Sequence, residues 1–175
     1  MDKDLSIVGK LEEIAPDERI YSTRFIGNRL YMVTFKRMDP LFVIDLSSPN
    51  EPKILGKLKI PGFSDYLHPY DENHIIGIGK EAAGGNEQFA WYQGMKIALF
   101  DVSDPGNPVE LSEYSIGDRG TDSYVLSDHK AFLFSRSKNL LVIPITLAKI
   151  DESKYPEGVP PYAYGDFVWQ GAYVF

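Results

Sequence analysis

The chain has 175 residues, a net charge of −7, 11 tyrosines, 10 phenylalanines and no cysteine. The acidic charge disfavours binding to nucleic acids or anionic membranes, because both require clustered Lys and Arg. The lack of cysteine excludes disulfides and thiolate chemistry, and no apolar run approaches the roughly 18 residues of a transmembrane helix. Aromatic and β-branched residues between Gly and Pro turns indicate an all-β protein.

The predicted strands begin with a leading outer strand and continue as three units of four strands. The leading strand is predicted at residues 5–11, where IVGKL at 7–11 matches ILGKL at 54–58. The units cover about residues 20–63, 64–119 and 120–175. Their strands are predicted at residues 22–26, 29–35, 41–47 and 53–60; 66–70, 74–79, 96–102 and 109–116; and 122–126, 131–136, 140–146 and 167–174.

The units repeat one another. Residues 43–52 (VIDLSSPNEP) return 56 residues later as residues 99–108 (LFDVSDPGNP). Residues 140–145 (LLVIPI) resemble residues 41–46, with Pro144 in place of Asp45. A fixed period of this size is typical of stacked supersecondary units.

Four-stranded units of this length, arranged radially, form the blades of a β-propeller. The repeated pattern resembles the LVIVD repeat of bacterial and archaeal cell-surface propellers. Residues 62–74, 117–122 and 164–173 further resemble an uncharacterised family of secreted archaeal and bacterial proteins, whose C-terminal β-propeller is distantly related to WD40 repeats. The resemblance implies a propeller fold and an extracellular or cell-surface location, and it carries over no catalytic residue.

The predicted fold is thus an all-β partial propeller of about three four-stranded antiparallel blades, with residues 1–175 as one domain. Closed propellers have roughly four to eight blades, so three blades leave an apolar face uncovered. We therefore expect either self-association or a longer propeller of which this chain is a part. The start, MDKD, lacks the charged-then-apolar order of a signal peptide.

Two insertions interrupt the repeat, at residues 80–94 and 149–165. The first is rich in glycine and aromatic residues, and propeller geometry places it on the face that carries the inter-blade loops. Aromatic rings with a few polar groups suit a glycan or peptide ligand. The candidate ligand-binding residues are Trp91, Tyr92, His68, Arg119 and Asp122. The alternative is that the aromatic rings only fill the gap between blades.

The remaining motifs favour structural roles. The three histidines lack the spacing of a zinc site, and the strand-end residues Asp45 and Asp101 are predicted to cap turns rather than bind calcium. Gly77 and Gly79 match part of a dinucleotide-binding pattern, but the nearby Gly84 interrupts the required helix, so both are predicted to lie in a strand packed closely against a neighbouring blade. We expect no cofactor and no metal.

The sequence favours a non-catalytic extracellular or cell-surface scaffold that presents loops for protein, peptide or glycan binding. The alternative is a hydrolase or lyase with its site on the loop face near the propeller axis. An enzyme requires converging titratable groups with shifted pKa values, whereas a binding face requires exposed aromatic rings. Neither nucleic acid nor membrane insertion is expected.

Overall fold

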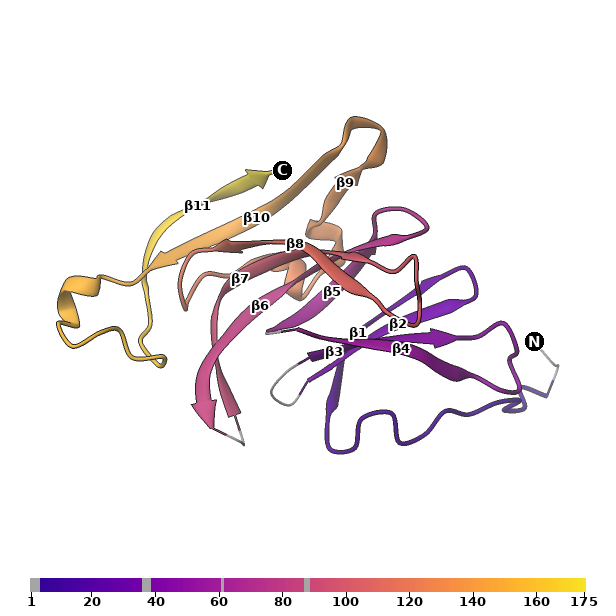
Figure 1. Ribbon diagram of the computed structural model, residues 1–175. Helices are drawn as coiled ribbons and strands as arrows, with labels where there is room; N and C mark the ends of the chain where they lie inside the picture. Colours follow the sequence, from indigo (N-terminus) through magenta and orange to yellow (C-terminus); the bar gives the residue numbers. More distant parts are fainter. Residues whose placement is uncertain (1–3, 36–38, 61, 87–88) are drawn as a thin grey trace.

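The computed structural model of the chain describes residues 4–35, 39–60, 62–86 and 89–175 (Figure 1). Its strands form three antiparallel sheets that follow one another in chain order and do not close into a ring. The predicted all-β architecture with three successive sheets is confirmed. Within the described ranges, no helix is long and apolar enough to cross a membrane.

The first two sheets are four-stranded meanders, as predicted. The first contains β1 (Arg19–Ile26), β2 (Arg29–Phe35), β3 (Asp39–Asp45) and β4 (Lys53–Ile60). The second contains β5 (Phe63–Pro69), β6 (His74–Asn86), β7 (Phe89–Asp101) and β8 (Val109–Ile116). Short turns join β1 to β2 and β5 to β6, and Gly27 supplies the positive φ of the first turn (57°).

The turns after β3 and β7 are built in the same way. The Oδ1 atoms of Asp45 and Asp101 accept hydrogen bonds from the backbone N–H groups of Ser47 (2.9 Å) and Ser103 (2.8 Å). The hydrogen bonds from these serines hold the pKa of each carboxyl below its usual value. The predicted turn-capping role of both aspartates is confirmed.

The third sheet has three strands, in the order β11–β10–β9. They are β9 (Leu133–Ser135), β10 (Leu140–Lys149) and β11 (Asp166–Val174). The intervening 3₁₀ turns are η1 (Tyr124–Leu126), η2 (His129–Ala131), η3 (Arg136–Lys138) and η4 (Glu152–Lys154).

The strand predicted at residues 122–126 is wrong, because most of this segment forms η1. Ser123 Oγ accepts a hydrogen bond from Val125 N (3.3 Å), and Asp128 Oδ1 accepts one from Lys130 N (3.0 Å). Such local side-chain bonds compete with strand pairing. Only Asp122 keeps a strand-like bridge, to Thr146.

The place assigned to residues 140–146 is also wrong. β10 follows a tight turn in which Asn139 accepts a hydrogen bond from the Tyr70 hydroxyl (3.0 Å), so this turn lies beside the β5–β6 turn. β10 therefore corresponds to the second strands β2 and β6, and β11 corresponds to the third strands β3 and β7. Second and third strands are both apolar and β-branched, so their sequences look alike. The one non-conservative difference in the alignment of residues 140–145 with residues 41–46 was Pro144 in place of Asp45.

The segment at residues 5–11, predicted as a leading outer strand, pairs with none of the three sheets in the part of the chain that the structure describes. Its Leu11, with Ile14 and Ala15 just beyond it, instead packs over a cluster on the outer face of the first sheet. That cluster contains Met32, Phe42 and Ile44.

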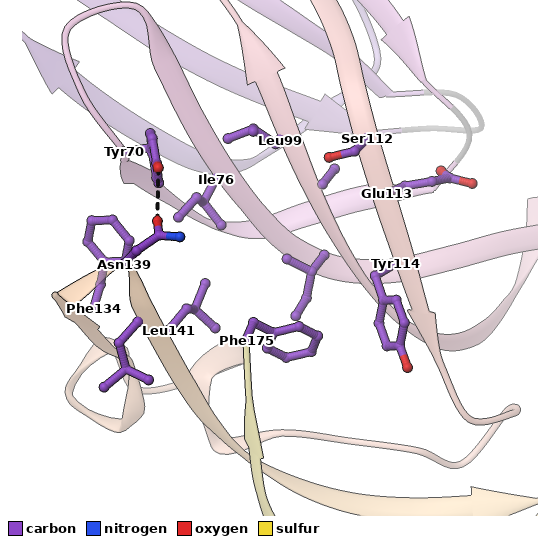
Figure 2. A pocket seen from close by; sticks show the side chains of 13 residues that line it. Tyr70, Ile76, Leu99, Ser112, Glu113, Tyr114, Phe134, Asn139, Leu141 and Phe175 are labelled. Carbon is purple, nitrogen blue, oxygen red and sulfur yellow. Dashed lines mark hydrogen bonds between the residues drawn. The ribbon is translucent and has the colours of Figure 1, made fainter. Parts of the chain in front are cut away.

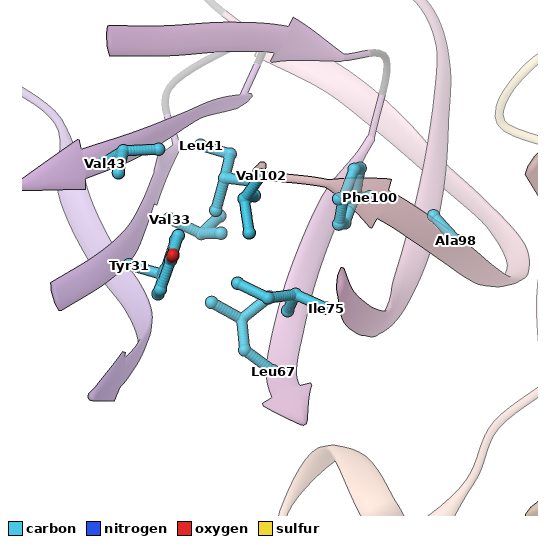
Figure 3. Close-up of a cluster of buried hydrophobic side chains, with 9 residues drawn as sticks. All are labelled: Tyr31, Val33, Leu41, Val43, Leu67, Ile75, Ala98, Phe100 and Val102. Atoms are coloured by element: carbon cyan, nitrogen blue, oxygen red, sulfur yellow. The ribbon is translucent and has the colours of Figure 1, made fainter. Parts of the chain in front are cut away.

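Two apolar cores lie between the sheets. Figure 3 shows the first, in which Tyr31, Val33 and Leu41 of the first sheet meet Leu67, Ile75 and Phe100 of the second. The second core joins Ile76, Ile78 and Met95 of the second sheet to Leu141, Ile143 and Ile145 of the third. Alternate residues of β6 thus face opposite neighbours, as expected for a sheet buried on both faces.

Candidate functional site

The insertion at residues 80–94 is an extension of two strands rather than a loop. β6 and β7 continue to pair beyond Lys80, with Ala82 opposite Tyr92 and Ala83 opposite Trp91. We call residues 81–86 and 89–94 the hairpin arm; it projects from the second sheet at the end opposite the β5–β6 turn (Figure 1). Because neighbouring residues of a strand point to opposite faces, Trp91 and Tyr92 face different surroundings.

The Trp91 side of the arm forms a stack with Arg119. The guanidinium carbon of Arg119 lies 4.7 Å from the centre of the Trp91 ring and 5.6 Å from that of Tyr164. Tyr162 packs against Trp91 with ring centres 6.1 Å apart. Cation–π contacts of this kind hold the guanidinium between the rings. We call Trp91, Arg119, Tyr162 and Tyr164 the aromatic platform.

The platform is fixed by backbone contacts but leaves two rings in solvent. Gln93 Nε2 donates to the Pro161 carbonyl (3.0 Å), and Gly165 N donates to the Arg119 carbonyl (2.7 Å). Tyr162 and Tyr164 remain 62% and 68% exposed. The platform therefore combines a braced base with accessible aromatic surface.

The sequence prediction included Trp91 and Arg119 of this platform but did not include Tyr162, Tyr164 or Gln93. The connection that carries both tyrosines joins β10 to β11, and the hairpin arm joins β6 to β7. Both are connections between second and third strands, so they emerge at the same end of neighbouring sheets. The sequence does contain a long insertion before β11. Because β10 was assigned as a third strand, this insertion was not recognised as a connection between a second and a third strand.

Tyr92 lies on the other side of the arm. Its ring packs against Phe63 (4.8 Å between centres) and Phe35 (5.8 Å), and its hydroxyl lies 3.4 Å from that of Tyr21. The side chain is 40% exposed. The structure therefore separates the two aromatic residues that the sequence placed in one site.

Asp122 belongs to a charged group at the base of the arm. Its Oδ1 lies 3.0 Å from Lys80 Nζ, which also donates to the Thr121 carbonyl (2.5 Å). Burial raises the pKa of Asp65 to about 6; the charge of Lys80 opposes this rise and that of Asp122 adds to it. Asp65 occupies the irregular position between Ser64 and Tyr66 in the β5–β6 register, which sequence patterns did not reveal.

We expect replacement of Asp65 by asparagine to stabilise the protein at neutral and alkaline pH. Because folding raises the pKa of Asp65 from 3.8, its contribution is favourable below that pH and is lost as pH rises through 6. The full effect is about 3 kcal/mol, and solvent screening of this half-buried group lowers it to about 2 kcal/mol. Urea unfolding at pH 8 should show the gain, and unfolding at pH 3.5 should not. An equal gain at both pH values, or a gain with the exposed control Glu51→Gln, would contradict this assignment.

His68 lies in a separate aromatic group on β5. Its Nδ1 is 3.0 Å from the Tyr66 hydroxyl, and its ring packs against Phe132 (4.6 Å) and Phe134 (5.1 Å). Burial, and secondarily the charge of Arg24, lowers the pKa of His68 to about 4. The ring is therefore neutral at physiological pH, and its contacts place it at the seam between the second and third sheets rather than on the platform.

A cavity of about 240 Å³ also lies along this seam (Figure 2). Ile76, Leu99, Leu141 and Phe175 give it an apolar lining, and Tyr70 and Asn139 close one side. Glu113 is the one charged side chain among the described residues that line the cavity, so we interpret the cavity as imperfect packing between the two sheets. Among the described residues, no cluster of three or more His, Asp or Glu side chains could hold a metal ion.

Comparison with known proteins agrees with this architecture. The family model described as "Beta propeller domain" matches residues 1–175. An uncharacterised protein of Methanocaldococcus jannaschii is 43% identical over 144 residues, which are 82% of this chain and 21% of that protein. An uncharacterised protein of Archaeoglobus fulgidus is 44% identical over 144 residues, with the same coverage. The chain thus spans about a fifth of the length of these relatives. No solved structure matches significantly.

Proposed function

Because this chain belongs to the β-propeller domain family, we propose that it is a non-catalytic binding scaffold whose aromatic platform recognises a glycan. The family supports a scaffold or binding role, and its relatives are uncharacterised. The proposal also places the protein outside the cell or on its surface, on the resemblance of its repeats to secreted propellers. Protein and peptide ligands are the alternatives for the same face.

The observation that carries the proposal is the exposure of Tyr162 and Tyr164 beside the Trp91–Arg119 stack. Flat aromatic surface with polar groups at its margin suits a sugar ring, which has an apolar face and a rim of hydroxyls. Arg119 lies against two of the rings, and Gln93 donates to the Pro161 carbonyl, next to Tyr162 in the chain. Since the stack is already formed, little ordering would oppose binding.

Tryptophan fluorescence tests the proposal directly. The chain has two tryptophans, so Trp169→Phe leaves Trp91 as the sole tryptophan reporter. In titrations with a set of defined linear oligosaccharides, we expect a saturable change in Trp91 emission with one of them. Tyr164→Ala should weaken that binding at least about tenfold, the size expected of an aromatic contact at the centre of an interface.

The matched control is Tyr124→Ala, because Tyr124 is 75% exposed and lies outside the platform. Neither tyrosine variant should change the free energy of unfolding by more than about 0.5 kcal/mol. Saturable binding of synthetic peptides instead of oligosaccharides would identify a peptide scaffold. No binding of either, with a large loss of stability in Trp91→Ala, would mean that the platform serves packing alone.

The raised pKa of Asp65 favours a second candidate, a hydrolase or lyase. A carboxyl with a pKa of about 6 beside Lys80 and Asp122 has the properties of a general acid or base. Release of reducing ends or unsaturated products from the same oligosaccharides would support this candidate. Loss of that release in Asp65→Asn, with oligosaccharide binding retained, would separate catalysis from recognition.

A further inference from the structure

The third sheet ends in an unpaired edge. Among the described residues, β11 pairs with β10 on one side only, whereas the corresponding strands β3 and β7 each have a further partner, β4 or β8. The edge is apolar, since Phe167, Val168 and Val174 are each more than half exposed. A long, exposed, apolar edge strand is a template for another strand.

The face of the third sheet that turns away from the second is also uncovered. Val142 holds on this face the position that Tyr31 and Ile76 hold in the first two sheets, and Leu133 of the first strand pairs with it. Tyr31 and Ile76 are at most 5% exposed because the next sheet covers them, whereas Val142 is only half-buried and its partner Leu133 is 51% exposed. The third sheet thus presents the surface against which another sheet packs.

The segment at residues 5–11 sits against the first sheet as β4 sits against the second. A Cβ atom built on Gly9 would lie 1.9 Å from the Pro49 carbonyl oxygen, and one built on Gly56 would lie 2.4 Å from that of Pro105. Leu11 packs against the cluster on the outer face of the first sheet. In the same way, Leu58 of β4 packs against the core that the first and second sheets share. With Ile7 82% exposed, the segment is placed like a fourth strand that lacks a sheet.

We propose that residues 5–11 of one copy of this chain pair with the β11 edge of a second copy and complete its third sheet. The β3–β4 register sets the alignment, since Val43 pairs with Gly56 and Leu41 with Leu58. Val174 and Ala172 take the places of Val43 and Leu41 in the third sheet. Gly9 therefore pairs with Val174, and Leu11 pairs with Ala172.

This pairing covers both uncovered faces together. Residues 5–11 stay attached to their own first sheet, so that sheet is carried onto the exposed Leu133 face of the other copy. Two such head-to-tail contacts join the three sheets of each copy into a ring of about six blades, within the four to eight that close a propeller. The proposed occupant of the edge is a second copy, held by backbone pairing.

Engineered disulfides test the register, because the chain contains no cysteine. Leu11→Cys combined with Ala172→Cys should give an intermolecular disulfide-linked dimer on non-reducing gels. The matched control is Lys10→Cys combined with Ala172→Cys, which turns one thiol to the opposite face of the sheet and should link poorly. Equal linking by both pairs, or linking by neither, would overturn the register.

Light scattering tests the association without altering residues 5–11. The parent chain should have twice its 19.8 kDa mass. Val174→Lys, at a residue 65% exposed, should leave the fold intact and raise the dimer dissociation constant at least about tenfold. Val168→Lys, on the same strand beyond the paired register, should not. A monomeric parent, open polymers, or equal effects of both lysines would overturn the proposal.

Discussion

Replacing Gly79 by alanine is expected to destabilise the protein by about 3 kcal/mol or more. A Cβ atom at this position would lie 1.7 Å from the Phe63 carbonyl oxygen and 2.8 Å from Ser64 Cα. Both neighbours are backbone atoms of β5, so relief requires separating β5 from β6 rather than rotating a side chain. For a chain of this size, the melting temperature should fall by roughly 6–12 °C.

Gly106→Ala provides the control for Gly79→Ala. A Cβ atom on Gly106 would meet its nearest neighbour, Asp104 Oδ1, at 3.4 Å, and the φ of Gly106 is not positive. The free energy of unfolding of this variant should change by less than about 1 kcal/mol. Similar losses in both variants, measured by calorimetry, would show that the close approach of β5 and β6 is not the cause.

Phe100→Ala is expected to cost about 3–5 kcal/mol of stability. Phe100 is fully buried in the core between the first two sheets, and its ring lies close over Gly77. Truncation removes contacts with both sheets and leaves a cavity that the rigid strands cannot fill. Denaturant unfolding should therefore show a lower midpoint.

Leu111→Ala tests whether the Phe100 effect comes from burial. Leu111 lies on β8 of the same sheet and is 52% exposed, so its truncation should change stability by no more than about 0.5 kcal/mol. A loss in Phe100→Ala as small as that in Leu111→Ala would contradict the account of the core.

The first two sheets were predictable because their repeat includes a structural device with a local cause. In the Asp-x-Ser turn after β3 and β7, the Asp side chain accepts a hydrogen bond from the backbone two residues later. The local sequence therefore determines the geometry of the turn. The third sheet lacks that turn within the described residues. Its assignment then depended on apolar pattern alone, which does not distinguish a second strand from a third.

An asparagine before each second strand would have identified β10 correctly as a second strand. Asn28, Asn73 and Asn139 each precede a second strand, three residues before Tyr31, Ile76 and Val142. The glycine prediction was similarly incomplete. Gly77 and Gly79 do lie in a strand, but the atoms that crowd them belong to β5 and β7 of their own sheet rather than to a neighbouring one.

The candidate site was only partly predictable. Composition and expected loop position were enough to propose Trp91 and Arg119 as neighbours, whereas the opposite placement of Trp91 and Tyr92 follows from the strand pairing of the hairpin arm. The raised pKa of Asp65 depends on burial at a register shift and on two charges distant in sequence. No local pattern encodes such a coincidence.

The stacking of three sheets in chain order gives the molecule an uneven resistance to opening. The second sheet shares an apolar core with each neighbour, whereas the first and third share one core each. Within one copy, opening the central unit disrupts two interfaces, and opening a terminal unit disrupts one. Backbone amides of β6 and β7 should therefore exchange their hydrogens last, so the hairpin arm rises from the most protected part of the chain.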